Sequence, residues 1–314
     1  MRVQSPSSAR FVEPMLSVAV PKLPEGPEWA YEVKFDGYRA QAIKTAGRVQ
    51  LRSRYGANFN ERFPSITHAL QALPDVTVID GEIVAYDAEG HPSFNVLQNH
   101  LSEKPRLQFF AFDLMFHRGS DLMHSPLEDR RRLLQRKVVP PLPDTIRFSE
   151  TLEASAAEVV EVIREMGLEG VVAKRRESRY EPGRRSGAWQ KMRINQVGEF
   201  VIGGYTPGGR NFDALLVGRR EGRKLVFVGK IRAGFTPALR DAVFARLTGL
   251  GPELCPFANL PESHHGRWGE GLTAEEMVLC RWVKPRLRAS VAYLEVTAAN
   301  HLRHAKFVSL LKRG

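Results

Sequence analysis

Lys34 is the residue whose type and neighbours most clearly suggest covalent chemistry. It begins a Lys-x-Asp-Gly pattern that includes Asp36 and Gly37, with Glu32 before it and Arg39 after it. A lysine amine attacks an electrophile only when it is neutral, so cationic neighbours or burial must lower a side-chain pKa of about 10.4 in a free lysine. Arg39 is one such cation, and the acids could bind a metal or orient a substrate. A pattern this short also occurs around ordinary exposed lysines, so other segments must decide between the two interpretations.

The residues around Lys34 predict two strands and a turn. Apolar and polar residues alternate over residues 31–35 and again over residues 38–43. The Asp36-Gly37 pair between them favours the positive φ angles of a tight turn. We therefore expect a hairpin, with Lys34 near the end of its first strand beside a sharp bend.

The rest of the chain reads as two regions that differ in their elements. In residues 1–195 strands are predicted over 49–54, 77–86 (interrupted at Asp80-Gly81-Glu82), 107–115, 170–173 and 188–194, and helices over 61–73, 127–138 and 154–166. In residues 196–314 strands are predicted over 199–205, 214–219, 224–231, 279–283 and 290–295, with one helix that starts at Thr236-Pro237 and a loop over 251–272. About five strands with one inserted helix match a small Greek-key barrel that often binds oligonucleotides.

Charge and composition narrow the class of protein. The formal net charge is +11, and residues 196–314 carry 18 Lys and Arg against 10 Asp and Glu. This excess predicts a surface that binds a polyanion, nucleic acid being the usual one, although a basic protein can also be merely soluble. Two cysteines allow no disulfide framework beyond one bridge. The chain has no run of 18 apolar residues and no apolar segment typical of a signal peptide. We expect a cytoplasmic protein without membrane contact. A zinc site formed by Cys255, His264 and His265 is disfavoured by their spacing.

Five further segments follow the Lys-x-Asp-Gly pattern in a recognisable order. They are Ser53-Arg54-Tyr55-Gly56, Asp80-Gly81-Glu82, Phe109-Phe110-Ala111-Phe112-Asp113-Leu114, Glu169-Gly170-Val171-Val172-Ala173-Lys174 and Trp189-Gln190-Lys191-Met192-Arg193. Together the six segments resemble the covalent nucleotidyltransferases, most closely the ATP-dependent DNA ligases, and within them the ligase module of bacterial end-joining ligases (the ligase D group). The resemblance extends from about Glu13 to Phe307. It implies an α+β chain in which a nucleotidyltransferase (adenylation) domain, residues 1–195, precedes an OB-fold DNA-binding barrel, residues 196–314.

The resemblance also implies roles for single residues. Lys34 would attack the α-phosphate of ATP to form lysyl-AMP. Glu82 and Glu169 would bind Mg²⁺ or Mn²⁺. Alternation sends Phe110 and Phe112 to the same strand face, and only the resemblance selects Phe112 for stacking on adenine. The nucleotide contacts it implies are Glu32 near the adenine, Arg39 near the phosphates or sugar, Arg54 on the ribose side, Glu82 at the ribose or metal, Phe112, and the cations Lys174, Lys191 and Arg193.

Two positions depart from the family pattern. Arg193 stands where the family has a second lysine, which keeps the charge but changes its geometry. Leu311-Lys312-Arg313-Gly314 stands where the family closes with Arg-x-Asp-Lys. Either Lys312 and Arg313 substitute electrostatically, or self-adenylation is slow and the protein seals already adenylated ends better than it charges itself.

The resemblance implies a substrate and partners as well. We expect a monomer that acts on duplex DNA with nicks or ends, together with a Ku-like end-binding protein. The sequence shows no DNA-clamping, polymerase or nuclease segment, so partners are expected to bring the DNA ends. An RNA ligase, a capping-type nucleotidyltransferase and a non-catalytic DNA-binding relative are the alternatives. The DNA-backbone contacts expected in the second region are Arg210, Lys230, Arg232 and Lys284.

Overall fold

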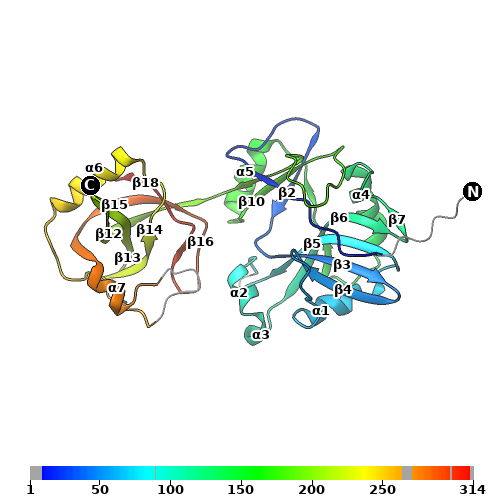
Figure 1. Cartoon of the computed structure of the whole chain (residues 1–314), viewed down its shortest axis with the longest axis horizontal. Helices are drawn as coiled ribbons and strands as arrows, with labels where there is room; N and C mark the ends of the chain where they lie inside the picture. Colours follow the sequence, from blue (N-terminus) through cyan, green and yellow to red (C-terminus); the bar gives the residue numbers. More distant parts are fainter. Residues whose placement is uncertain (1–8, 89, 264–270, 298, 312–314) are drawn as a thin grey trace, which may run out of the picture. The chain divides into compact units, whose positions relative to one another are not determined.

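The computed structural model describes residues 9–88, 90–263, 271–297 and 299–311. The chain forms two compact units, the first ending at Ile194 and the second beginning at Asn195 (Figure 1). Each unit has its own apolar core. Within the described ranges, no helix has both the length and the apolar character that crossing a membrane requires.

Two sheets and five short helices make up the described part of the first unit. One sheet runs in the order β1 (Val18–Ala19), β11 (Trp189–Arg193), β10 (Gly170–Arg175), β2 (Trp29–Lys34) and β9 (Thr151–Leu152). The other runs in the order β4 (Arg48–Ser53), β3 (Tyr38–Thr45), β5 (Thr77–Ala85), β6 (Leu107–His117) and β7 (Ser120–Asp121), with β8 (Ile146–Phe148) also beside β6. The helices are α1 (Pro64–Ala69), α2 (Phe94–Gln98), α3 (His100–Glu103), α4 (Leu127–Leu133) and α5 (Ala156–Glu165), with a 3-10 turn at Leu70–Ala72 and a π turn at Leu134–Val138.

The strands predicted on either side of Asp36-Gly37 are present, but the predicted hairpin between them is wrong. β2 pairs with β10 and β9, whereas β3 pairs with β4 and β5, so this link carries the chain from one sheet to the other. Gly37 does not have a positive φ. A Cβ at Gly37 would lie 2.2 Å from the backbone oxygen of Ile83, so the glycine is needed for the close approach of the chain to β5. Lys34 therefore ends β2 where the chain crosses between the two sheets.

The predicted interruption of the strand at Asp80-Gly81-Glu82 is also wrong. All three residues lie within β5, and only the register against β6 is irregular between Asp80 and Gly81. A Cβ at Gly81 would lie 2.3 Å from the ring of Phe109, so this glycine likewise permits a close contact. Glu82 is consequently a strand residue with a fixed direction.

Helix α5 covers one face of the sheet that contains β2. It starts with a capping box between Ser155 and Glu158, and its buried side chains Val159 and Ile163 pack in one apolar cluster with Val171 of β10. Alternate residues of β2, β10 and β11 face this cluster. The remaining alternate residues of these strands face the other side of the sheet, where the polar segments lie.

Five long strands form the curved sheet of the second unit. Their order is β14 (Lys224–Ile231), β13 (Asn211–Glu221), β12 (Gln196–Gly208), β15 (Arg281–Tyr293) and β18 (Lys306–Leu310), with the small pair β16 (Glu295–Val296) and β17 (Leu302–Arg303). Phe307 of β18 donates its backbone N–H to Ala233, just beyond β14, at 2.9 Å. This single parallel bridge brings the two ends of the sheet together without a continuous ladder.

The sequence predicted only some of the helices and strands of the second unit correctly. The predicted helix start is confirmed: α6 (Pro237–Thr248) is capped by Thr236, and Gly249 follows its last residue. Helix α7 (Ala274–Leu279) was not predicted. Residues 281–283 and 290–293 of the two predicted strands belong to the single strand β15, whereas Leu279 ends α7 and Glu295 begins β16.

Candidate active site

Strand pairing places three rows of side chains on the face of the first sheet that is opposite α5. Residues directly paired across antiparallel strands project to the same side, so each row crosses β2, β10 and β11. Segments that are more than 130 residues apart in the sequence are thereby brought together. The rows are Lys34–Gly170–Arg193, Glu32–Val172–Lys191 and Ala30–Lys174–Trp189.

Lys34 lies in the first row and is held by a carboxylate. Its side chain is 15% exposed and forms an ion pair with Glu169, which is 4% exposed. Arg193 donates from Nε to the other carboxylate oxygen of Glu169 at 3.0 Å. Glu169 therefore compensates two cations at once, and it connects the start of β10 to both ends of the row.

Lys191 lies in a concentration of positive charge. Burial lowers the pKa of Lys191, and the charges of Lys34, Arg193, Arg185 and Arg54 lower it further. A polyphosphate is the kind of ligand that such a cluster attracts. Arg54 and Arg193 were predicted as site residues and lie in this cluster. Arg185, which donates to the backbone oxygen of Ser17, was not singled out by the sequence analysis.

Glu32 is the buried acid of the second row. Its Oε1 lies 2.8 Å from Nζ of Lys174 and 2.9 Å from Nη1 of Arg131. Its Oε2 accepts a hydrogen bond from the hydroxyl of Ser149 at 2.9 Å. Burial lowers the pKa of Lys174, although the charge of Glu32 opposes this effect. Arg131 and Ser149 were not predicted as parts of the site.

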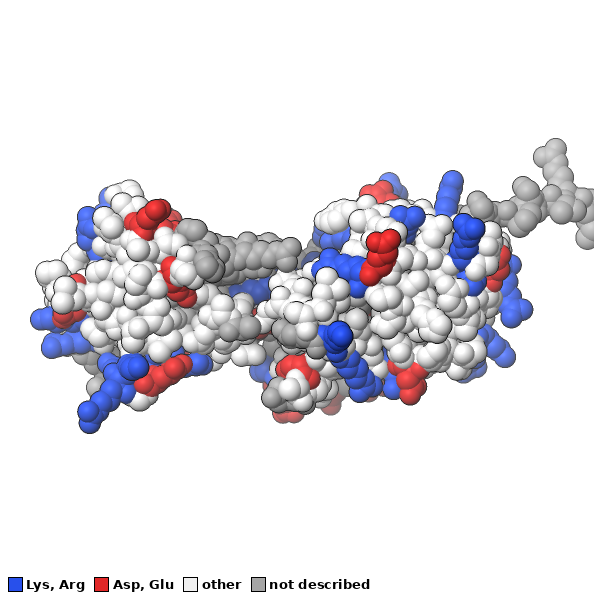
Figure 2. Space-filling model, turned by 90° about the horizontal axis from the view of Figure 1, so that it is seen from below, with Lys and Arg blue, Asp and Glu red and all other residues white. Residues whose placement is uncertain are grey.

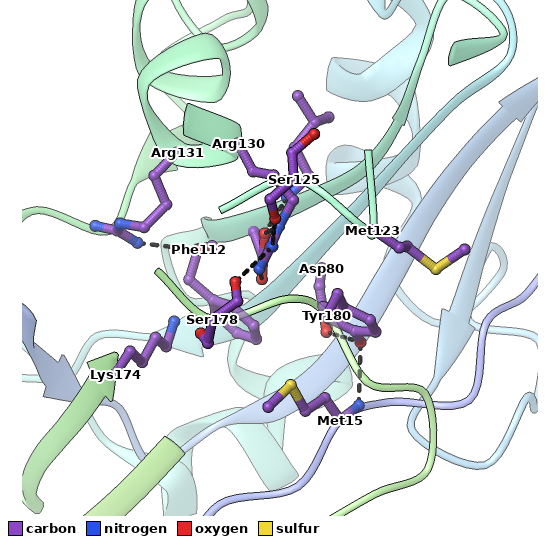
Figure 3. Close-up of polar contacts among 12 residues, drawn as sticks. Met15, Asp80, Phe112, Met123, Ser125, Arg130, Arg131, Lys174, Ser178 and Tyr180 are labelled. Atoms are coloured by element: carbon purple, nitrogen blue, oxygen red, sulfur yellow. Dashed lines mark hydrogen bonds and ion pairs between the residues drawn. The ribbon is translucent and has the colours of Figure 1, made fainter. Parts of the chain in front are cut away.

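The ring of Phe112 lies beside these groups. Lys174 places Nζ 4.3 Å from the centre of the ring, and Trp189 contacts it edge-on at 6.1 Å between ring centres. Figure 3 shows Lys174 directed towards Phe112, whose backbone oxygen accepts a hydrogen bond from Arg131. Phe110 instead stacks on Phe35 at 4.1 Å. The two phenylalanines therefore have different surroundings, which alternation could not indicate.

Arg39 is engaged by protein groups. It binds both carboxylate oxygens of Asp80, at 3.1 and 2.7 Å, and donates to the backbone oxygen of Met15 at 2.7 Å. Tyr180 donates to Asp80 at 2.7 Å and accepts from the backbone N–H of Met15 at 3.2 Å (Figure 3). Burial alone would lower the pKa of Arg39, but Asp80 raises it above its usual value. Arg39 therefore ties the N-terminal segment to β5, and a nucleotide contact by it stays a prediction.

Glu169, which is ion-paired with Lys34, and Glu82, whose carboxyl interacts electrostatically with Lys34 and Glu169, are the acids predicted to bind a metal. Burial raises the pKa of Glu82 to about 8, and the charges of Lys34 and Arg39 oppose this shift. Throughout the described ranges, no group of three or more His, Cys, Asp and Glu side chains is arranged for a metal ion. Two carboxylates suit Mg²⁺, which often takes one or two protein carboxylates and completes its shell with water and substrate phosphates.

The expected DNA contacts of the second unit have different surroundings. The side chain of Lys230 is only 4% exposed and donates to the backbone oxygen of Gly271 at 2.8 Å, so it is not exposed for the DNA-backbone contact that was expected of it. Arg210 and Arg232 are exposed and ion-paired, and Lys284 is exposed. On the face drawn in Figure 2, Lys and Arg side chains stand at the surface of both units, with Asp and Glu side chains between them. The predictions about Lys312, Arg313, His264 and His265 lie outside the described residues.

An amine at a strand end, beside two acids and within a cluster of cations, is the arrangement of a covalent nucleotidyltransferase. Comparison with known proteins makes the class more specific. The model of the ATP dependent DNA ligase domain matches residues 14–193, and that of the ATP dependent DNA ligase C terminal region matches residues 208–312.

Relatives and solved structures agree with these two matches. The multifunctional non-homologous end joining protein LigD of Pseudomonas aeruginosa is 37% identical over 309 residues, which cover 96% of this chain and 35% of that protein. LigD of Mycobacterium tuberculosis is 35% identical over 289 residues, which cover 90% of this chain and 36% of that protein. The structure of mycobacterial DNA ligase D complexed with ATP and MES is 32% identical, with a TM-score of 0.56 and 96% of each chain covered.

The chain belongs to the ATP-dependent DNA ligase family, and its similarity to LigD ligase domains extends over both units. The predicted family and enzyme class are confirmed. The predicted fold class is confirmed as well: a nucleotidyltransferase domain is followed by a C-terminal domain like that of the LigD structures. The chain spans about a third of the length of the curated LigD relatives.

Proposed function

We propose that this chain is the ligase unit that seals 5′-phosphate/3′-hydroxyl breaks in duplex DNA during end joining, through an AMP carried on Lys34. The observation that supports this most directly is the position of the Lys34 amine. It lies at the end of β2, in ion-pair contact with Glu169, and it contributes to the positive charge around Lys191. A nucleophile in such a cluster is suited to attack a phosphate whose charge the cations hold.

The reaction divides a difficult joining step into three phosphoryl transfers. The nitrogen of Lys34 forms a bond to the α-phosphorus of ATP, the bond to the bridging oxygen breaks, pyrophosphate leaves and the amine gives up a proton. A 5′-phosphate oxygen of DNA then attacks the same phosphorus, the phosphorus–nitrogen bond breaks, and the Lys34 amine leaves with a proton taken up. Finally the 3′-hydroxyl attacks the 5′-phosphorus, so that AMP and a proton leave. Positioning and fixed charge supply most of the catalysis in such reactions.

The remaining site residues are proposed as nucleotide contacts. Lys191 and Arg193 contact the α-phosphate, and Phe112 stacks on the base that Glu32 recognises. Glu82 and Glu169 would bind Mg²⁺ or Mn²⁺, which would offset the negative charge that develops on the phosphate oxygens. The other proposed contacts are Arg39 and Arg54 at the sugar and phosphates and Lys174 at the nucleotide.

The second unit is proposed to bind the DNA backbone through exposed cations such as Lys284. Association with a Ku-like end-binding protein, a monomeric state and a cytoplasmic location near the nucleoid complete the proposal. They follow from the similarity to end-joining ligases and from the basic charge of the second unit.

A labelling experiment tests the central step. The protein is incubated with Mg²⁺ and ATP labelled at the α-phosphate, and the covalent adduct is measured on a denaturing gel. We expect an adduct that Lys34→Ala eliminates, together with all sealing of a nicked duplex, while DNA binding persists. Lys34→Ala should still seal a nick whose 5′-phosphate already carries AMP, because the last transfer does not require AMP on the lysine. An adduct that forms with labelled GTP but not with ATP would contradict the proposal.

A further inference from the structure

Two neighbouring arginines of α4 are both buried, yet they hold different parts of the first unit. Arg130 is 1% exposed and Arg131 is 5% exposed. Arg130 binds both carboxylate oxygens of Asp113 at 2.8 Å and donates to the backbone oxygens of Ser125 and Ser178. Figure 3 shows Arg130 directed towards Ser125 and Ser178, and Arg131 directed towards Phe112. Arg130 thus secures the fold around β6, whereas Arg131 extends to the base-recognising acid.

Arg131 is anchored on one side by Phe148, Ser149 and Thr151, which are not proposed to contact the nucleotide. Its Nη2 donates to the backbone oxygen of Ser149 at 2.6 Å and to the hydroxyl of Thr151 at 3.2 Å. Its guanidinium carbon lies 4.6 Å from the centre of the Phe148 ring. Its Nη1 donates to the backbone oxygen of Phe112 at 2.9 Å and lies 2.9 Å from Oε1 of Glu32. These contacts restrict the planar guanidinium of Arg131 to one orientation.

Glu32 needs such a support because its charge is almost entirely removed from water. Its side chain is 2% exposed, and a buried carboxylate is stable only when cations and hydrogen bonds compensate it. Lys174 also compensates it, but Lys174 has a flexible side chain whose amine lies over Phe112, where a stacked base would bind. Arg131 and the hydroxyl of Ser149 are therefore the fixed partners of the two carboxylate oxygens.

We propose that Arg131, assisted by Ser149, is a positioning residue that holds the Glu32 carboxylate in one orientation, and that this makes the site select a base with a 6-amino group. The inference rests on the proposed function. A carboxylate accepts the N–H of a 6-amino group, as in adenine, but it faces a 6-carbonyl oxygen as a second acceptor. Without Arg131, the Glu32 carboxylate can turn away from the base, so that it neither accepts from a 6-amino group nor opposes a 6-carbonyl oxygen. Selectivity between the two kinds of base is then lost.

The experiment measures a ratio, which a general structural defect does not change. Rates of adduct formation are compared for ATP and for ITP, in which a 6-carbonyl replaces the 6-amino group. In the wild type ATP should be strongly preferred. In Arg131→Met the ratio of kcat/KM for ATP to that for ITP should fall roughly tenfold to hundredfold, the range of one hydrogen bond to a charged group. Arg131→Lys should restore part of the ratio, and Ser149→Ala should lower it by a few fold.

Arg130→Lys is the matched control. It changes the adjacent, equally buried arginine, so it should lower the melting temperature and yet leave the ratio at the wild-type value. If Arg131→Met does not fold, Arg131→Lys and Ser149→Ala still report the ratio. The proposal is overturned if these variants retain the wild-type ratio, or if the wild type uses ITP as well as ATP. A wild type that forms no adduct with ATP at all would instead contradict the proposed function.

Discussion

The first unit buries more charged side chains than the described part of the second unit does. Acids and cations are buried in the interior of the first unit, and examples are Glu32, Glu169 and Lys174. Fewer such groups occur among the described residues of the second unit, where the side chains of Lys230 and His301 are each 4% exposed and the core consists of apolar side chains such as Phe212 and Phe227. Burying charged groups lowers the stability of a fold. The buried acids and cations of the first unit are therefore expected of a preorganised reaction site. The core clusters of the second unit are apolar.

Two pairs of the same chemical kind show this difference most clearly. Arg130 and Asp113 form an ion pair in which both side chains are 0% exposed. Arg232 and Asp213 form an ion pair in which the side chains are 55% and 53% exposed. The same substitution in each pair therefore measures how much of the stability of each unit depends on buried charge.

Asp113→Ala is expected to have the largest effect. It leaves Arg130 buried without its carboxylate partner, and breaking a buried pair in this way costs about 3–5 kcal/mol. Urea unfolding monitored in the first unit should show this loss. A cost below about 1 kcal/mol would mean that water reaches Arg130 and that the interior of this unit is less rigid than its geometry indicates.

Lys191→Ala is expected to impair chemistry more than folding. Removing a preorganised charge that stabilises a transition state typically costs 10²–10³ in rate, and we expect this loss in lysyl-AMP formation. Lys284→Ala in the second unit is the matched control. It should leave adduct formation unchanged and weaken DNA binding. The slope of the logarithm of the DNA-binding constant against the logarithm of the salt concentration should fall in magnitude by about one. Equal effects of both substitutions on adduct formation would contradict the division of roles between the units.

Several features of this site were accessible from the sequence. Lys34 lies at the end of a strand as predicted, and alternation placed Lys191 and Arg193 on one face. The partner of each strand was not accessible, because Asp36-Gly37 carries the local signal of a turn whether the flanking strands pair with each other or enter different sheets. Pairing is decided by contacts with residues far along the chain, such as Gly170 opposite Lys34.

The buried arginines show a second limit, and also a signal that was overlooked. The segment over 127–138 was interpreted as a basic helix, which suggests a solvated face. Leu127, Arg130, Arg131 and Leu134 nevertheless follow the i, i+3, i+4, i+7 spacing of a buried helix face, and all four are buried. Cations within an apolar stripe indicate buried partners, but the sequence does not say that these partners are Asp113 and Glu32.

The half-buried acid Glu82 should give a smaller, pH-dependent effect. Burial raises its pKa from 4.5 to about 8, so the folded protein holds this proton more tightly than the unfolded chain. The stability that this provides is complete below about pH 4.5 and is lost as the pH rises through 8. Glu82→Gln stays neutral and should be more stable than the wild type at pH 9 without metal, by at least about 1 kcal/mol, and by less at pH 5. Urea unfolding at both pH values measures this, and Glu165→Gln, at an exposed position of α5, should show no such trend.

Asp213→Ala is expected to have the smallest effect and completes the comparison with Asp113→Ala. Both partners of the exposed pair remain hydrated when the carboxylate is removed, and Arg232 keeps its contact with water. Exposed ion pairs typically contribute below about 1 kcal/mol, and salt screens them further. Urea unfolding monitored in the second unit should therefore change by less than about 1 kcal/mol, and the difference should shrink at high salt. A loss as large as that of Asp113→Ala would show that exposed charge stabilises the second unit as strongly as buried charge stabilises the first, and the contrast between the two units would then be wrong.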